Sequence, residues 1–229
     1  MEEGRGGFQK IPRPESWHLG APAPWEGMEY RDFTLDVLES AISGYNSRTL
    51  SDQTKERRRS AVLIPIYYSA QNGLHLILTR RSAMMKHHTH EVSFPGGNQE
   101  PEDQDLWATA IREAHEEIGL DPELPRLVGT LDSFITVGSN SLVTPFVAIL
   151  DSVPALKANP MEVEEIIDIP LTELLDPNIY REEVWQWQDG RSRPVYFFEL
   201  IGDTVWGATA SMLRQFLLVL FSMEQTKQF

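Results

Sequence analysis

Three glutamates in the middle of the chain have the spacing of a metal-binding helix face. Glu113, Glu116 and Glu117 stand at positions i, i+3 and i+4, which places their side chains on one face of an α-helix. Like charges about 6 Å apart repel by roughly 3 kcal/mol per pair at an effective dielectric near 20. A hard divalent cation, which prefers oxygen ligands, would offset that repulsion. The spacing therefore predicts a cation site on this helix.

The flanking residues extend the pattern. Gly96 and Gly97 stand ahead of an acidic loop, and Arg112 and Gly119 bracket the glutamates. The segment resembles the signature box of the Nudix hydrolases, which runs Gly, five residues, Glu, seven residues, then Arg-Glu-apolar-x-Glu-Glu-x-Gly-apolar. Every position from Arg112 onward matches. The first half departs, because Asp103 stands in place of the first glutamate and the spacing to Arg112 is one residue longer.

The resemblance implies a role for each acidic side chain of the helix. Glu113 and Glu117 would bind Mg²⁺ or Mn²⁺, Glu116 would share a second ion, and the backbone carbonyl of Gly97 would complete the coordination shell. Oxygen ligands of this kind suit both cations.

Neighbouring residues are expected to support this site. Arg112 is expected to be structural, because it can pair with Glu116 one helical turn later or reach Asp103, and so fix the carboxylates for the metal. The general base is left open between two acids, Glu116 in the helix and Glu165 later in the chain. A water activated by a cation needs only a modest base, so either carboxylate would serve.

A second motif lies directly upstream. Residues 78–97, LTRRSAMMKHHTHEVSFPGG, are similar to the extra motif of the coenzyme A pyrophosphatase branch of the Nudix hydrolases. The matching positions are Leu78, Thr79, Arg81, Ser82, Val92, Ser93, Phe94, Pro95, Gly96 and Gly97. Lys86 replaces an expected arginine, which keeps the charge but loses the two-pronged guanidinium. His90 replaces an expected glycine, and a side chain there disfavours a backbone with positive φ.

The resemblance to this branch implies a reaction. The chain would hydrolyse the pyrophosphate bond of coenzyme A or a derivative, giving 3′,5′-ADP and 4′-phosphopantetheine, with Arg81, Lys86 and Ser82 binding the substrate. Residues 159–165 and 205–210 resemble two further stretches of the same branch. Two alternatives stay open. One is a Nudix hydrolase of another nucleoside diphosphate derivative, such as ADP-ribose or a dinucleoside polyphosphate; the other is a Nudix module that binds a nucleotide without cleaving it.

The hydrophobic pattern predicts the elements that must position these residues. We expect helices over 34–42, 105–118, 171–175 and 208–222, and strands over 61–68, 74–79, 91–94, 127–135, 142–150, 163–169 and 195–200. This order of elements suggests a mixed sheet between helices, the α/β fold of a Nudix-type α/β/α sandwich. We divide the chain into an N-terminal extension (1–58, an irregular arm and a short helix), the Nudix domain (59–222) and a C-terminal tail (223–229).

Composition limits the partners. The net charge of −14 argues against a general nucleic-acid binder, because phosphate contacts need a basic surface. One basic patch precedes the glycine pair and would attract an anionic nucleotide substrate; its residues are Arg80, Arg81, Lys86, His87, His88 and His90. No apolar run approaches the roughly 20 residues that span a bilayer, and no secretory or clear organellar signal is present. A cytoplasmic location is therefore expected, and a homodimer is left open.

Overall fold

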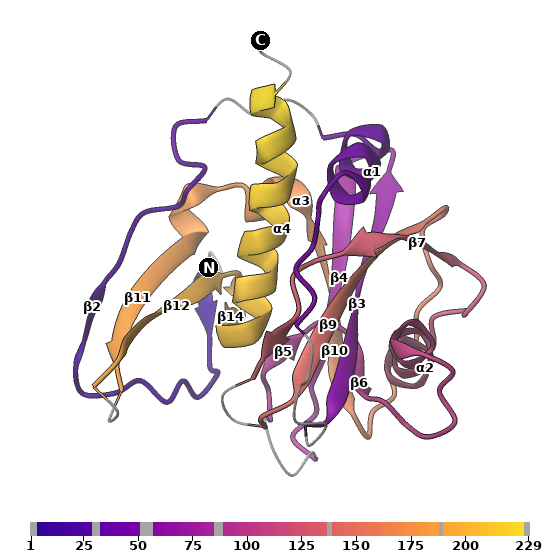
Figure 1. Cartoon of the computed structure of the whole chain (residues 1–229), viewed down its shortest axis with the longest axis horizontal. Coiled ribbons are helices and arrows are strands. Elements are labelled where there is room, and N and C mark those ends of the chain that lie inside the picture. The colour runs from indigo at the N-terminus through magenta and orange to yellow at the C-terminus, as the bar shows by residue number, and fades with distance from the viewer. Residues whose placement is uncertain are drawn as a thin grey trace.

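The protein is represented by a computed structural model that describes residues 4–28, 33–50, 57–84, 89–136, 139–187 and 190–226. A mixed sheet of eight strands forms its centre, with five strands in the order β10-β4-β3-β9-β7 and three short ones attached (Figure 1). Its strands are β3 (Arg59–Ser69), β4 (Gly73–Arg81), β5 (Val92–Ser93), β6 (Gly96–Asn98), β7 (Pro125–Thr130), β8 (Phe134–Ile135), β9 (Leu142–Leu150) and β10 (Val163–Pro170). Strands β3 and β9 are parallel, and the other pairs are antiparallel.

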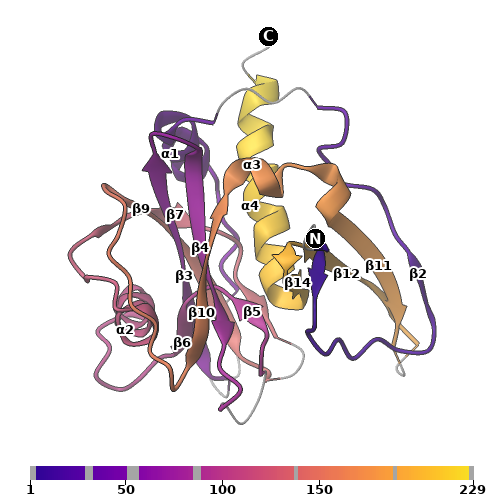
Figure 2. The same ribbon diagram turned by 180° about the vertical axis from the view of Figure 1, so that it is seen from behind.

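Helices cover both faces of this sheet. Helix α2 (Leu106–Ile118) lies on one face, and α1 (Leu35–Ser43) and α4 (Gly207–Thr226) lie on the other (Figures 1 and 2). The short α3 (Leu171–Leu174) follows β10. Each face has its own cluster of buried apolar side chains. The α/β/α sandwich predicted from the sequence is confirmed. None of the helices in the described ranges is long and apolar enough to cross a bilayer.

A second, four-stranded sheet packs on the far side of α4, so that α4 lies between two sheets (Figure 1). Its order is β14-β12-β11-β2, with the bounds β2 (Trp17–Leu19), β11 (Tyr180–Gln186), β12 (Ser192–Glu199) and β14 (Thr204–Trp206). Beside it, β1 (Gly6–Gly7) pairs with β13 (Ile201–Gly202), and a short 3-10 helix, η1 (Pro177–Ile179), precedes β11. Of this second sheet, only the strand near 195–200 was predicted from the sequence. The expectation of an irregular arm is wrong for β1 and β2, because distant strands supply their pairing partners.

The predicted strand over 127–135 is also corrected, because it is interrupted between β7 and β8. The backbone amide of Ser133 donates to the carbonyl of Arg48 (3.0 Å), so the chain leaves the sheet ladder there to pair with residues ahead of the domain. Strands β3 and β4 form a hairpin, with Ser69 opposite Gly73.

Helix α2 begins and ends where its sequence predicts. The carboxylate of Asp105 accepts a hydrogen bond from the amide of Ala108 (2.8 Å), which caps the first turn. Gly119 ends the helix in the left-handed conformation, with φ of 64°. Ala114 and Ile118 are fully buried against the sheet. Glu113 and Glu117 flank this buried face and lie beside Gly97 of β6 and Arg81 at the end of β4.

Candidate metal and phosphate site

The site begins where α2 packs against the glycine pair of β6. A Cβ atom on Gly97 would lie only 2.4 Å from the carboxylate of Glu113, so only glycine leaves room for this carboxylate as it stands. Burial raises the pKa of Glu113, against the lowering effect of Arg112, and repulsion from Glu116 and Glu162 adds to the rise. The guanidinium of Arg112 is 3.0 Å from Glu113 and balances part of its charge.

Glu117 lies deeper and is only 3% exposed. Its carboxylate accepts a long hydrogen bond from the amide of Gly96 (3.3 Å) and lies 3.6 Å from the guanidinium of Arg81. These partners are too distant to replace the lost water, so burial raises the pKa of Glu117 to about 8 even though Arg81 lowers it. An added positive charge stabilises the ionised form of a buried carboxylate with weak partners more than that of an exposed one.

Arg112 joins the acidic loop to the helix. Its guanidinium donates to Asp103 (2.9 and 3.1 Å), to Glu116 (2.9 Å) and to the carbonyl of Asn98 (3.0 Å). The hydrogen bonds from Arg112 hold the pKa of Asp103 at about 2, well below its usual range. Asp103 also accepts from the hydroxyl of Thr109 (2.9 Å). These contacts favour a structural role for Arg112 and Asp103.

The predicted cation ligands are held by arginines in this arrangement. Within the described ranges, no three acidic, histidine or cysteine side chains stand close enough to form a metal site as they are. Arg112 pairs with Glu113 and Glu116, and Arg81 lies beside Glu117. The donor set nevertheless suits Mg²⁺ or Mn²⁺, because it consists of carboxylates next to the backbone of Gly97. The buried carboxylate of Glu117, whose ionised form lacks close partners, is the feature that best fits such a cation.

Arg81 and Ser82 bring the upstream motif to the same place. Arg81 ends β4 beside Glu117, and among the described residues no hydrogen-bond acceptor reaches its buried Nε atom. The hydroxyl of Ser82 donates to the carbonyl of Pro160 (3.1 Å), and its amide donates to the carbonyl of Glu162 (2.8 Å). Ser82 thus ties the end of β4 to the turn before β10.

Comparison with known proteins identifies the family. The family model of the NUDIX domain matches residues 57–188. The chain belongs to the Nudix hydrolase family. It is 36% identical over 168 residues to the uncharacterised Nudix hydrolase NudL of Photorhabdus laumondii, which covers 73% of this chain and 86% of the relative. It is 39% identical over 162 residues to Nudix hydrolase 22, chloroplastic, of Arabidopsis thaliana, covering 68% of this chain and 53% of that one.

Among solved structures, a MutT/nudix family protein from Enterococcus faecalis is similar with a TM-score of 0.49 and 14% identity, over 75% of this chain and 65% of that one. Nudix hydrolases are pyrophosphohydrolases, and this chain is an enzyme of that class acting on a nucleoside diphosphate derivative.

The predicted base Glu165 lies apart from the α2 glutamates of this Nudix hydrolase. Adjacent side chains of β4 point to opposite faces of the sheet, so Arg81 faces α2 while Arg80 faces the other way. Glu165 forms its ion pair with Arg80 on that other face. Glu116 is half-exposed and paired with Arg112. Lys86 lies outside the described residues.

Glu162 was not assigned a role from the sequence. Its negative charge adds, after burial, to the raised pKa of both Glu113 and Glu117. The backbone of its turn is held by the amide of Val163, which donates to the carbonyl of Asn159 (2.8 Å). The signal was present in the Asn-Pro-Met-Glu-Val stretch, but no spacing rule connects that stretch to a helix more than forty residues earlier.

His90, which stands where a glycine was expected, has a left-handed backbone conformation. Its φ is 61°, in the left-handed region, which costs a residue with a Cβ atom roughly 1–2 kcal/mol. A side chain disfavours this conformation, as expected, but His90 adopts it nonetheless. The imidazole Nδ1 lies 2.8 Å from Glu164, and the ring packs against Phe8, so several contacts offset the strain.

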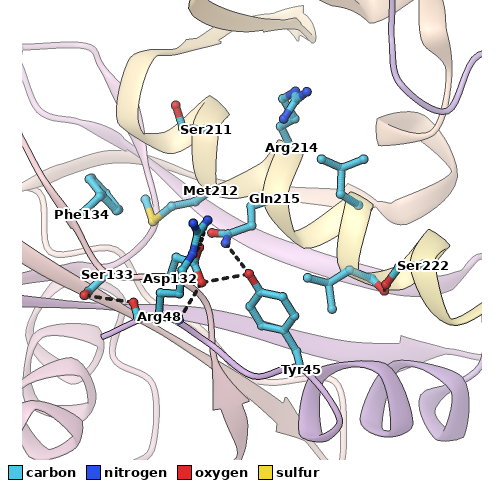
Figure 3. A pocket seen from close by; sticks show the side chains of 12 residues that line it. Tyr45, Arg48, Asp132, Ser133, Phe134, Ser211, Met212, Arg214, Gln215 and Ser222 are labelled. Carbon is cyan, nitrogen blue, oxygen red and sulfur yellow. Dashed lines mark hydrogen bonds and ion pairs between the residues drawn. The ribbon is translucent and has the colours of Figure 1, made fainter. Parts of the chain in front are cut away.

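A hollow of about 550 Å³ lies elsewhere, between α4 and the start of β8 (Figure 3). It is on the face of the sheet opposite α2 and is thus separate from the glutamates. The hydroxyl of Tyr45 donates to Asp132 (2.8 Å) and accepts from Gln215 (3.0 Å) (Figure 3). Arg48 donates to the same carboxylate (2.9 Å), so these polar groups largely satisfy one another.

Proposed function

We propose that this Nudix hydrolase cleaves the pyrophosphate bond of coenzyme A or a derivative with Mg²⁺ or Mn²⁺, giving 3′,5′-ADP and 4′-phosphopantetheine. The observation that carries the proposal is the buried carboxylate of Glu117 between the glycine pair and Arg81. At this point the acidic helix meets the upstream motif that resembles the coenzyme A branch. Residues 59–222 would carry the reaction, with residues 1–58 as an extension and 223–229 as a tail.

Glu113 and Glu117 would hold the cation, with Glu116 sharing a second ion and the Gly97 carbonyl adding an oxygen. When bound, the cation neutralises charge that develops on the phosphate oxygens. Arg112 would release Glu113 toward the cation while keeping its bonds to Asp103. The role of Arg112 and Asp103 is then to hold the loop and helix at a fixed distance.

Arg81 would bind the substrate phosphates directly. Its Nε has no acceptor among the described residues, so the guanidinium has a donor to give to an anionic oxygen. Ser82 would support Arg81 by holding the turn before β10 against the end of β4. Lys86 is expected to add a second positive charge. Together they bring a basic surface to a chain whose net charge is −14.

For the general base, the contacts favour Glu162 over Glu165. The charge of Glu162 acts on both Glu113 and Glu117, and its backbone is tied to Ser82 beside Arg81, whereas Glu165 is paired with Arg80 on the opposite face. A base at Glu162 would take the proton from the attacking water while the water oxygen bonds to phosphorus. The bridging P–O bond then breaks, and the other phosphate leaves with its bridging oxygen. Glu116 stays a candidate because it lies one turn from Glu113 on the same helix face.

The substrate assignment is tested by comparing coenzyme A with dephospho-coenzyme A. A site that recognises the 3′-phosphate should process dephospho-coenzyme A more slowly, by about tenfold for the loss of one charge-assisted contact. Glu117→Gln and Glu113→Gln should each lower kcat by at least about 100-fold at saturating Mg²⁺, whereas Glu123→Gln, at an exposed position, should not. Equal rates on both substrates would contradict a dedicated 3′-phosphate site.

The departures at Lys86 and His90 support a second candidate, a Nudix hydrolase of ADP-ribose or a dinucleoside polyphosphate. The two candidates share the acidic helix and differ in the part of the substrate beyond the pyrophosphate.

A cytoplasmic location and a homodimer also belong to the proposal. Cell fractionation tests the location, and light scattering of the purified protein tests the homodimer.

A further inference from the structure

The N-terminal segment contacts the turn that carries His90. The ring of Phe8 packs edge-on against the imidazole of His90, with ring centroids 5.0 Å apart. The side-chain amide of Gln9 donates to the carbonyl of His90 (3.1 Å). One contact holds the side chain of His90 and the other holds its backbone, so the segment fixes the left-handed turn from both sides.

Gln9 is itself firmly anchored. It donates to the carboxylate of Asp203 (2.6 Å) and accepts from the amide of Thr204 (2.8 Å), and only 7% of it is exposed. Asp203 also binds the guanidinium of Arg80 (2.8 Å). The segment therefore connects the second sheet to the last residues of β4.

Backbone hydrogen bonds join the turn at His90 to Arg81. The amide of His90 donates to the carbonyl of Arg81 (3.0 Å), and the amide of Arg81 donates to the carbonyl of Glu91 (2.9 Å). The side chain of Arg81 faces Glu117, while its neighbour Arg80 faces Asp203. The contacts that hold His90 and Arg80 on one face of the sheet therefore also set the position of Arg81, whose side chain lies on the other face.

We propose that Phe8 and Gln9 are positioning residues for the phosphate site: they hold the turn at His90 and so place Arg81 opposite Glu117. The inference rests on the proposed function only in giving Arg81 a substrate phosphate to bind. The strain of a histidine at a glycine-like position explains why this chain would need such a support.

The first test compares Phe8→Ala and Gln9→Ala with the full-length enzyme. We expect each variant to raise KM more than it lowers kcat, with kcat/KM falling about fivefold, the size of one aromatic or hydrogen-bond contact. Hydrogen exchange measured by NMR should speed up at the amides of Arg81 and His90. Ser16→Ala, which removes a contact from the same segment to Gln186, is the matched control, and Phe8→Tyr should restore wild-type behaviour.

The second test removes the strain. Glycine adopts the turn without support, so His90→Gly should keep turnover, and adding Phe8→Ala to it should change kcat/KM by less than about twofold. An undiminished effect of Phe8→Ala in the glycine background would overturn the proposal, as would unchanged exchange at Arg81 and His90 in both single variants. The exchange readout does not require catalysis, so it decides the inference even where coenzyme A is not cleaved.

Discussion

The carboxylate of Glu117 is buried between Gly96 and Arg81, both of which lie beyond a short hydrogen-bond distance. Three helix glutamates that would repel one another are balanced by two arginines, Arg81 and Arg112. The sequence predicted the common face of the glutamates and the pairing of Arg112 with Glu116. The positive charge beside Glu117 could not be predicted, because Arg81 comes from the end of β4 and not from the helix. A cation bound at these glutamates would therefore compete with the arginine contacts.

This balance makes the stability of the protein depend on pH when EDTA removes divalent cations. The folded pKa of Glu117 is raised to about 8 from 4.5, so the folded state binds a proton that the unfolded state releases. The stability that Glu117 contributes is therefore complete below about pH 4.5 and is lost as the pH rises through 8. Glu117→Gln should exceed the wild type in unfolding free energy at pH 8, on the order of 2–4 kcal/mol, and much less at pH 5.

Urea denaturation at the two pH values measures this difference. Glu116→Gln, at a half-exposed position on the same helix, should show no such pH-dependent gain. Adding Mg²⁺ at pH 8 should stabilise the wild type and not the Glu117→Gln variant, because a ligand stabilises only the state that binds it. A constant difference between wild type and variant across this pH range would refute the assigned burial effect.

Gly97 gives a second prediction at the same scale. In Gly97→Ala the new methyl group would meet the carboxylate of Glu113, which is the far end of a flexible side chain, so the protein should fold while Glu113 moves away. We expect the Mg²⁺ concentration for half-maximal activity to rise by about tenfold or more. Gly4→Ala, where no atom lies near the added carbon, is the control. An unchanged Mg²⁺ requirement would mean that Glu113 is not a ligand.

Among the elements, α2 is the one that its sequence determines most completely. Its first turn is capped by Asp105, its end is set by Gly119, and its apolar residues recur at helical spacing. Strand β11 is the opposite case: its sequence YREEVWQ carries three charged residues and lacks the alternation of an amphipathic strand. Its Glu183 is fully buried, which is stable only because distant partners such as Arg13 satisfy it. Local pattern cannot reveal such partners.

The end of α2 gives a prediction at this scale. Gly119→Ala forces a methyl group into the left-handed region and within 3.3 Å of the carbonyl of Lys157, so we expect a loss of about 1–2 kcal/mol in unfolding free energy. Gly119→Asn should lose less, because asparagine tolerates this conformation better. Chemical denaturation compares the two variants, and an alanine variant as stable as the asparagine variant would contradict the backbone argument.

At the scale of the whole molecule, two sheets share α4 as a common layer (Figure 2). The periodicity of strands such as β3 and β9 was sufficient to predict the central sandwich. The second sheet was not predictable, because β2 pairs with β11 across more than 160 residues of sequence. The N-terminal segment is thus part of the packed structure, and its contacts to the turn at His90 link that sheet to the candidate site.

Removing the anchor of β2 should therefore destabilise the molecule. Arg13 donates twice to the buried Glu183 (2.9 and 2.5 Å) and stacks on the ring of Trp17. Arg13→Ala should lower the unfolding free energy by about 1–3 kcal/mol, with Arg181 still partly balancing Glu183. Arg5→Ala breaks only longer, more exposed ion pairs and should cost less than about 0.5 kcal/mol. Equal effects of the two variants would argue that β2 is only loosely attached.

The proposed reaction is tested most directly by chromatography of coenzyme A after incubation with the purified protein and millimolar Mg²⁺, with a parallel sample containing EDTA. The account predicts 3′,5′-ADP and 4′-phosphopantetheine in equal amounts in the Mg²⁺ sample, and neither product with EDTA or with Glu117→Gln. Intact coenzyme A in all samples, under conditions where ADP-ribose or a dinucleoside polyphosphate is cleaved, would contradict it.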